Sequence, residues 1–297
     1  MSLVKLQALE KRRKKEALIF LAPWLIGFAA FFIFPLGYSL VLSFCKVENF
    51  RTMELVFVGI NHFKRAFVED TGLIPKVLEV IGQTVTMGPL IVIFSFFVAV
   101  LLNKNIRFRG FFRAAFFLPV IIGTGFIMEQ LFDQGVQLNA MNEARKLLLP
   151  DSLVLYIGAE GVQMIDNFLG MLSSVFWKSG VQIIIFLAAL QKIPSSLYES
   201  ARVDSATEWE MFWLITLPQI SPMILLCSVY TCVDFFTSSD NPAIALMRSY
   251  IFNSKDFEYG AAVSWIYCLL VLALMGCIFL LMLPMLRRSA DEGRQKS

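Results

Sequence analysis

Long apolar runs constrain this chain more than any other feature. A helix needs about 20 apolar residues to cross the roughly 30 Å hydrocarbon core of a bilayer, and six runs reach or approach that length. The chain of 297 residues is 57% hydrophobic and 16% charged, whereas a soluble domain is roughly half apolar and a quarter charged. The pattern predicts an all-α, polytopic membrane protein with six transmembrane helices.

The predicted spans differ in the residues that interrupt them. In chain order they cover about residues 18–44, 83–102, 111–131, 167–190, 221–239 and 259–286. Pro23 and Pro35 are expected to bend the first span, Lys178 interrupts the fourth, and Asp234 lies in the fifth. The first run is far longer than the apolar core of a signal peptide, so we expect it to remain as a span.

The distribution of Lys and Arg predicts the orientation. With the N-terminus inside, the inner segments carry 16 basic residues and the outer loops carry 9, and basic residues concentrate on the cytoplasmic side. Both termini are therefore expected in the cytoplasm. The predicted organisation is a cytoplasmic tail over residues 1–16, a transmembrane permease domain over 17–286, and a second cytoplasmic tail over 287–297.

Several kinds of site are not indicated. The net charge of +3 is too small to indicate nucleic-acid binding. Four of the five cysteines lie in apolar runs, where Cys acts as a small hydrophobe, and no metal-ligand spacing occurs. His62, the only histidine, is expected to be a solvated residue of an outer loop. No G-x-x-x-x-G-K-[ST] phosphate-binding motif is present, so the chain is expected to be no enzyme and to bind no cofactor or metal itself.

A polar segment over residues 194–222 separates the fourth and fifth runs. It contains three capping-box patterns, which begin at Ser196, Ser205 and Thr207. We expect two short helices joined by a tight turn, the first starting just after Pro194 and the second stopping near residues 217–218. The alternative interpretation is an ordinary surface loop with good caps.

This segment resembles the EAA loop of ABC importer permeases, whose pattern is E-A-A-x-x-D-G-A followed by I-x-L-P. The matching residues are Glu199, Ala201, Asp204, Ala206, Ile215, Leu217 and Pro218. Two positions depart from the pattern, Ser200 for alanine and Ser205 for glycine. If the turn requires a left-handed conformation, Ser205 costs about 1–2 kcal/mol. The resemblance implies that these nine residues couple the permease to an ATPase subunit.

Three further segments are similar to the carbohydrate-type permeases of these importers, and the resemblance covers roughly residues 17–285. They are Phe57-Val-Gly-Ile-Asn-His-Phe63, Arg109-Gly-Phe-Phe-Arg-Ala-Ala-Phe-Phe-Leu-Pro119 and Phe186-Leu-Ala-Ala-Leu-Gln-Lys-Ile-Pro194. The family has relatives for maltose-like oligosaccharides and for glycerol-3-phosphate.

The resemblance implies that the chain has a type I ABC importer permease fold. It also implies that the chain lies in the bacterial cytoplasmic membrane and spans it several times. It implies a second permease, with a heterodimer favoured over a homodimer. It also implies two ATPase subunits that bind ATP and magnesium, and an extracytoplasmic binding protein that delivers a sugar or oligosaccharide. Membrane lipids are the remaining partner, and nucleic acid is not expected.

Polar side chains inside the predicted spans are candidates for a substrate path, because ionisable residues in lipid are costly. They are Trp177, Lys178 and Gln182 on the fourth span, and Tyr230, Thr231, Asp234, Thr237 and Ser238 on the fifth. The alternative for most of them is polar packing between helices. For Lys178 and Asp234, snorkelling to the outer surface and a mutual ion pair remain open.

Other transport classes compete with the sugar importer. A permease for glycerol-3-phosphate or another small polar solute, including a peptide or an amino acid, would carry the same coupling loop. An ion-coupled secondary transporter would usually show more spans and inverted repeats around broken helices. A membrane-embedded lipid transferase would need convergent acids or histidines near the membrane surface, and none is visible.

Overall fold

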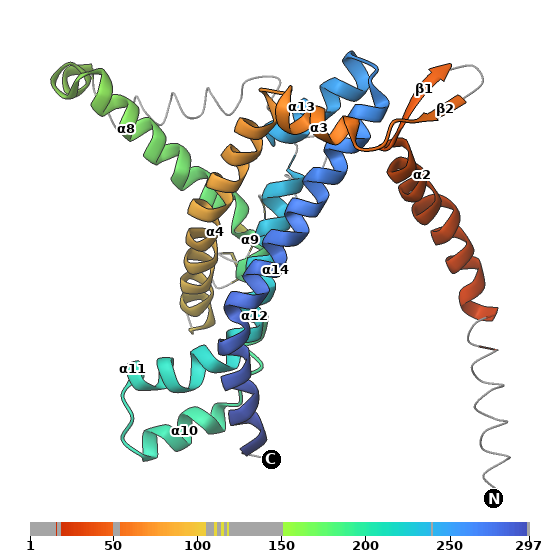
Figure 1. Ribbon diagram of the computed structural model, residues 1–297. Coiled ribbons are helices and arrows are strands. Elements are labelled where there is room, and N and C mark those ends of the chain that lie inside the picture. The colour runs from red at the N-terminus through yellow and green to blue at the C-terminus, as the bar shows by residue number, and fades with distance from the viewer. Residues whose placement is uncertain are drawn as a thin grey trace, which may run out of the picture. The chain divides into compact units, whose positions relative to one another are not determined.

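The computed structural model describes residues 16, 19–49, 54–104, 110–111, 114–115, 118, 151–238 and 240–295 (Figure 1). The chain divides into two compact units. Unit 1 comprises residues 1–78 and 239–270, and unit 2 comprises residues 79–238 and 271–297. The two long helices α4 (Leu73–Asn103) and α14 (Phe257–Gln295) each contribute residues to both units.

Four helical stretches within the described residues are long and apolar enough to cross a membrane. They are Ile19–Leu42, Leu73–Asn103, Glu208–Thr237 and Phe257–Pro284. A fifth candidate is the pair Glu160–Lys178 and Gly180–Leu190, which is bent by 51°. The bend falls at Ser179, directly after the lysine that interrupts the predicted fourth span. The predicted third span lies outside the described residues, apart from isolated positions.

Two spans begin earlier than expected. The second starts at Leu73, ten residues before the predicted position, and the fifth is continuous with the polar segment from Glu208 onward. The expectation that the second short helix stops near residues 217–218 is therefore wrong. The physical reason is that a π-helical turn over Phe212–Thr216 precedes Pro218, so the helix continues through a residue that lacks an N–H.

Wide helical turns precede two prolines. The π-helical segments η1 (Ala29–Ile33) and η2 (Phe212–Thr216) end two residues before Pro35 and Pro218 respectively. A π-helical turn shifts the hydrogen-bond register, so the helix can continue through a residue that lacks an N–H. At Pro222 the freed carbonyl of Pro218 instead accepts a hydrogen bond of 2.9 Å from the Ser221 hydroxyl.

Unit 1 contains a small β-hairpin that the all-α expectation missed. Strand β1 (Cys45–Asn49) pairs in antiparallel fashion with β2 (Glu54–Phe57). Gly59, with a φ of 63°, then turns the chain into helix α3 (Asn61–Val68), which explains the glycine of the 57–63 motif. His62 lies on this helix and donates to the Cys45 carbonyl at 3.1 Å, so its expected place in a solvated loop is wrong.

The rest of unit 1 comes from both of its chain segments. It consists of α2 (Phe34–Leu42), α13 (Pro242–Arg248), the π-helical segment η3 (Ser249–Asn253) and the first part of α14. Asn241 caps α13 by accepting from the amides of Ala243 and Ile244.

Unit 2 is built around three helices that pack along an apolar seam. They are α4, α9 (Gly180–Leu190) and α12 (Leu217–Thr237). The seam is filled by buried residues from all three, including Ala99, Phe186 and Ile220, which are fully buried. Phe96 packs edge-on against Phe186 with 5.5 Å between ring centroids. This core anchors α8 (Asp151–Lys178), which is broken at Gly158, and the short helices that follow α9.

Candidate functional site

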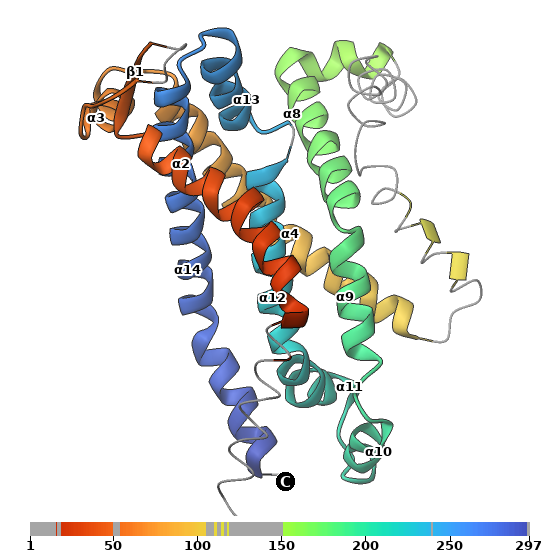
Figure 2. The ribbon, with the colours of Figure 1, turned by 90° about the vertical axis from the view of Figure 1, so that its right-hand side faces the viewer.

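The polar segment forms a helix–turn–helix knob between α9 and α12. Helix α10 (Ser195–Val203) is followed by a tight turn and by α11 (Glu208–Met211), which runs through η2 into α12. In both ribbon views α11 lies on the side of the knob toward the other helices of unit 2, and α10 lies on the far side (Figure 1, Figure 2). The prediction of two short helices joined by a turn is confirmed.

The turn between the helices requires a left-handed residue. Ser205 has a φ of 61°. Its N–H donates to the Arg202 carbonyl at 3.1 Å, and the Ala206 N–H donates to the Ala201 carbonyl at 2.9 Å. These two bonds define a Schellman motif, in which the left-handed position usually holds glycine. Ser205 therefore occupies the position where the family pattern has glycine, in the conformation that glycine favours.

One of the three capping boxes is used. The Thr207 hydroxyl accepts from the Glu210 amide at 3.3 Å, and the Thr207 amide donates to the Glu210 carboxylate at 2.7 Å. The box predicted at Ser205 is wrong, because that residue takes the left-handed position in the turn after α10. The box predicted at Ser196 is also wrong, since α10 starts at Ser195 after Pro194, without a side-chain cap.

One side-chain contact links α10 to the helix that leads into the span, and the Glu199 side chain of α10 is exposed. The hydroxyls of Tyr198 and Thr216 lie 2.9 Å apart and link α10 to η2. Glu199 is exposed and makes no hydrogen bond or ion pair within the described part of the chain. The other predicted coupling residues divide by burial. Ser200, Asp204 and Ser205 are exposed, whereas Ala201, Ala206, Ile215, Leu217 and Pro218 are half-buried.

Replacing Ser205 with glycine is expected to stabilise the turn by about 0.5–1 kcal/mol, because glycine avoids the left-handed cost but loses more chain entropy on folding. Hydrogen exchange of the amides over residues 201–210 should slow several-fold. The matched control is Ser200→Gly, in the exposed interior of α10, which should speed exchange of the same amides. Faster exchange in the Ser205→Gly variant would show that the turn does not need this conformation.

The predicted path residues form a polar seam between the α8–α9 break and α12. The Lys178 ammonium donates to the Asp234 carboxylate at 3.1 Å and to the Ser238 hydroxyl at 3.4 Å, and it lies 5.0 Å from the centre of the Phe235 ring. The side chains of Lys178 and Asp234 are 18% and 34% exposed. The sequence left open whether Lys178 and Asp234 reach the outer surface or pair with each other, and in the structure they form an ion pair.

A second pair lies deeper in the same seam. The Gln182 amide nitrogen donates to the Thr231 hydroxyl at 2.9 Å, and Thr231 donates in turn to the Cys227 carbonyl at 2.7 Å. Both side chains are buried, and the Gln182 amide oxygen is a buried polar atom without a partner among the described residues.

The remaining candidates are separate from this network. Trp177 is 41% exposed and Tyr230 is 37% exposed. Thr237 is also exposed, and its hydroxyl donates to the Val233 carbonyl of its own helix.

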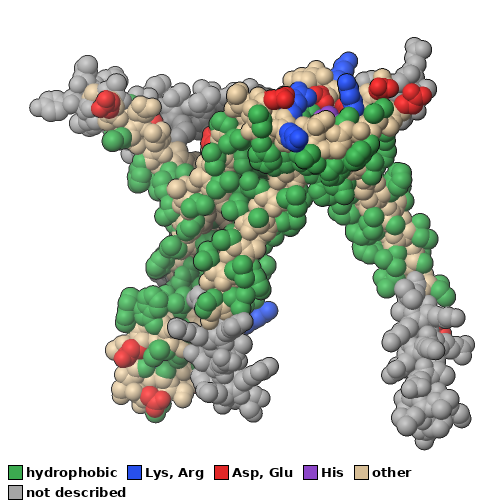
Figure 3. All heavy atoms as spheres, viewed as in Figure 1, with side chains coloured by type: hydrophobic (Ala, Val, Ile, Leu, Met, Phe, Trp, Pro, Cys, Tyr) green, Lys and Arg blue, Asp and Glu red, His purple; other side chains and the backbone are tan. Residues whose placement is uncertain are grey.

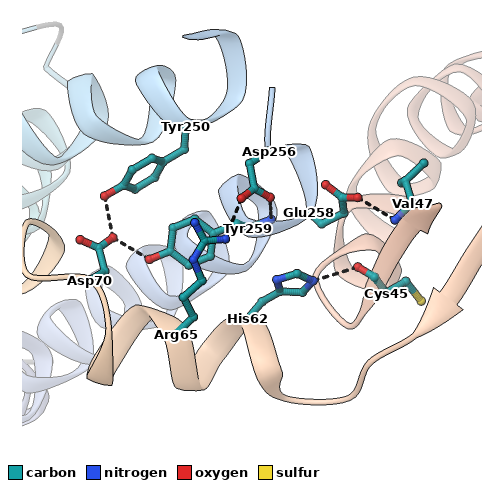
Figure 4. A network of polar contacts seen from close by, with 9 residues as sticks. All are labelled: Cys45, Val47, His62, Arg65, Asp70, Tyr250, Asp256, Glu258 and Tyr259. Carbon is teal, nitrogen blue, oxygen red and sulfur yellow. Dashed lines mark hydrogen bonds and ion pairs between the residues drawn. The ribbon is translucent and has the colours of Figure 1, made fainter. Parts of the chain in front are cut away.

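Sequence reasoning missed a dense polar network in unit 1, the Asp70 network, shown in Figure 4. The Asp70 carboxylate accepts hydrogen bonds of 2.6 Å from both the Tyr250 and Tyr259 hydroxyls. Beside it, the Arg65 guanidinium pairs with Asp256 at 2.7 Å and lies 4.1 Å from the centre of the Tyr259 ring. These contacts join α3 and the start of α4 to η3 and the start of α14.

The shifts in pKa keep Asp70 and Arg65 charged near neutral pH. Burial raises the pKa of Asp70, but hydrogen bonds from the two tyrosines and from the amides of Gly72 and Leu73 outweigh it, and the net pKa is lowered. Burial and the bond to Asp70 raise the pKa of Tyr250. The hydrogen bond to Asp256 is the main reason that the pKa of Arg65 is raised.

The sequence contains a signal for one member of this network, because Asp70 stands just before the residues that form α4. Asp70 accepts from the amides of Gly72 and Leu73 at 2.8 and 3.2 Å, which caps the start of α4. An Asp shortly before an apolar run is typical of a helix start. Among the described residues, no group of three or more His, Cys, Asp and Glu side chains could hold a metal ion.

Comparison with known proteins gives related permeases. No family model matches the chain. The chain is 27% identical over 280 residues to the probable ABC transporter permease protein YesP of Bacillus subtilis (strain 168), with 85% of each chain covered. It is 26% identical over 290 residues to the lactose transport system permease protein LacF of Rhizobium radiobacter, covering 86% of this chain and 90% of LacF. The chain is related to the permeases of carbohydrate ABC importers.

Two solved structures share the fold of this chain. A crystal structure of a bacterial ABC transporter involved in the import of the acidic polysaccharide alginate matches with a TM-score of 0.59 and 21% identity, covering 95% of this chain and 99% of that chain. A bacterial alginate ABC transporter in complex with an alginate pentasaccharide-bound periplasmic protein matches with a TM-score of 0.57 and 18% identity, covering 94% and 96%. At these identities the likeness concerns the fold alone.

Proposed function

We propose that this chain is the permease subunit of an ATP-driven ABC importer that moves a sugar or oligosaccharide. The knob over α10 and α11 is the observation that carries the proposal. It is a rigid, exposed helix pair joined directly to a span, and its Glu199 carboxylate has no partner within the described chain. The sugar cargo is supported by the names of the curated relatives, such as the lactose permease LacF.

The proposal includes a membrane topology and an assembly. The chain crosses the bacterial cytoplasmic membrane six times, with its tails over residues 1–16 and 287–297 and the knob in the cytoplasm. It pairs with a second, different permease, and each knob engages one of two ATPase subunits that bind ATP and magnesium. An extracytoplasmic binding protein delivers the cargo, as suggested by the alginate transporter in complex with a periplasmic protein. The chain itself performs no catalysis.

Coupling follows from the continuity of the knob with the membrane helix. When the ATPase pair closes on ATP, it displaces the knobs. The Tyr198–Thr216 contact and the helical connection from α11 into α12 transmit that displacement to the span, because they join both helices of the knob to it. The spans then change between inward and outward access. The seam of Lys178, Gln182, Thr231, Asp234 and Ser238 lies along the moving helix and is the proposed substrate path. The exposed Trp177, Tyr230 and Thr237 belong to the same proposed path.

The cargo is proposed to be a neutral glycan. Lys178 is already paired with Asp234, so this seam offers no free cation to a doubly charged phosphate such as glycerol-3-phosphate, which remains the second candidate.

A co-purification experiment tests the function. The tagged chain is expressed with the ATPase and second permease from its own genome and isolated in a mild detergent. We expect all three to purify together, and we expect the partner binding protein to show a thermal shift with a sugar from a panel. Isolation of the chain without an ATPase, or a knob that is labelled from outside the cell, would contradict the proposal.

Replacing Asp234 with asparagine, or Gln182 with alanine, is expected to reduce sugar uptake while the complex still assembles. The matched control is the double replacement of Lys178 and Asp234 by methionine, which removes both charges and leaves no unpaired ion in the span. If the pair only holds the helices together, the double variant should recover uptake. Continued loss of uptake in a well-assembled double variant indicates substrate contact, and unchanged uptake in both single variants would remove this seam from the path.

A further inference from the structure

Helix α11 and the η2 segment that follows it carry an exposed aromatic face, which the coupling role does not require. Trp209 is 69% exposed, Trp213 is 47% exposed, and Leu214 is 72% exposed. The two indole rings pack edge-on with 5.5 Å between centroids, and Trp213 packs on Phe212 at 5.3 Å. Phe212 in turn contacts Phe96 of the core at 5.8 Å. The face is therefore held rigidly at the base of the knob.

The length of the helix decides which environment this face meets. The stretch Glu208–Thr237 has 30 residues, which corresponds to about 45 Å at 1.5 Å per residue. The hydrocarbon core is roughly 30 Å thick, and the bilayer with its headgroups is roughly 40–45 Å. The first few residues of this stretch must then lie at the depth of the headgroups, where Trp and Tyr side chains concentrate.

The exposed apolar side chains also continue along the span. Leu214 is followed by the exposed Pro222 and by Leu226, which is 50% exposed. One π-helical turn and one α-helical turn together take about eight residues, so Leu214 and Pro222 lie on one face, with Leu226 one turn further. The aromatic face is thus the end of an apolar stripe on a membrane helix.

The acidic side chains of the two knob helices differ: those of α11 have partners within the knob, whereas Glu199 of α10 has none among the described residues. The acids of α11 are engaged locally, Glu208 in an ion pair with Arg202 at 3.4 Å and Glu210 in the capping box. The unpaired Glu199 and the exposed Asp204 and Val203 belong to the α10 side. In the space-filling view, hydrophobic side chains gather over the α11 part of the knob, and acidic side chains lie beyond them toward α10 (Figure 3).

We propose that Trp209 and Trp213 insert into the headgroup layer of the membrane, and that α10 alone faces the ATPase. This inference rests on the proposed function for the identity of the α10 partner, but not for the lipid contact. Anchored in this way, α11 pivots at the membrane surface when α10 is pushed, and α12 turns with it.

Fluorescence quenching by brominated lipid tests the proposal. The assembled complex is placed in nanodiscs of phosphatidylcholine, with or without bromine on the acyl chain near the carbonyl. The fluorescence lost in the double variant Trp209→Phe/Trp213→Phe gives the signal of these two residues, and tryptophans of the partner subunits cancel in the difference. We expect brominated lipid to lower that signal about twofold, since tryptophan at the interface contacts the upper acyl chain.

The presence of the ATPase separates the outcomes. Quenching should be the same with and without the ATPase, whereas a probe on Val203→Cys should be shielded only when the ATPase is bound. If the tryptophans escape brominated lipid and are instead shielded by the ATPase, the aromatic face is a protein-docking surface and the proposal is overturned. It is equally overturned if aqueous iodide quenches them in all states. If lipid quenching persists but no ATPase binds, the coupling function fails and the lipid contact stands.

Discussion

Replacing Asp70 with alanine is expected to lower the stability of the purified chain by about 2–4 kcal/mol, because hydrogen bonds to a charged group contribute about 1.5–3 kcal/mol each and partial exposure reduces that value. The carboxylate accepts from two tyrosine hydroxyls and two backbone amides. Its loss would remove the hydrogen bonds that hold η3 and the start of α14 to the start of α4, and would leave only the Arg65–Asp256 ion pair beside them. The measurement is the thermal unfolding midpoint in detergent.

Two variants make the result specific to the network. Glu69→Gln removes the same charge from the neighbouring, exposed residue and should leave the midpoint unchanged. Tyr250→Phe removes one hydroxyl and should cost about 1–2 kcal/mol, less than the alanine variant. An Asp70→Ala chain that melts with the wild type would mean that the network does not hold unit 1 together.

The pH dependence follows from the direction of the pKa shifts. The pKa of Asp70 is lower in the folded chain than its ordinary value, so its stabilisation is complete above about pH 4 and is lost as the pH falls through the folded pKa. The pKa of Tyr250 is raised, so its contribution is complete below about pH 10 and is lost only as the pH rises through the folded value. Between pH 5 and 8 the difference in midpoint between wild type and Asp70→Ala should therefore be constant.

Local patterns predicted the knob better than the contacts around it. Residues 194–210 contain three Ser/Thr-x-x-Glu patterns, and the two that begin at Ser205 and Thr207 overlap, so only one of them can start the second helix. Thr207 is used because the left-handed residue that ends α10 falls on Ser205. The sequence indicated that serine there would be costly in a left-handed turn, but not that the turn has that conformation.

The Asp70 network could not be predicted, because its members are far apart in the chain. Asp70 and Tyr259 are separated by 189 positions, and no helical or strand periodicity relates them. The ion pair of Lys178 and Asp234 was one of the options, because two opposite charges in apolar surroundings stabilise each other. The burial of Gln182 against Thr231 was not distinguished from a substrate-facing position, since both place a polar side chain inside the bundle.

Replacing Glu199 with lysine is expected to weaken binding of the ATPase at least about 30-fold, because reversing a charge in a desolvated protein interface costs about 2 kcal/mol or more. The fold of the knob should not change, since this carboxylate is exposed and bonds to no described residue. Uptake should fall with it, and hydrolysis of ATP by any complex that still assembles should no longer depend on cargo. Co-purification and an uptake assay in vesicles measure both effects.

The matched control is Glu208→Lys, which makes the same charge change on the other helix of the same knob. Glu208 is 80% exposed and forms only a surface ion pair with Arg202, so its replacement should cost less than about 1 kcal/mol. A second variant, Ala206→Asp, places a carboxylate in the half-buried contact between α10 and α11 and should disrupt the knob itself. Normal assembly in both Glu199→Lys and Ala206→Asp would show that the knob is not where the ATPase pushes, because one variant changes its surface and the other its shape.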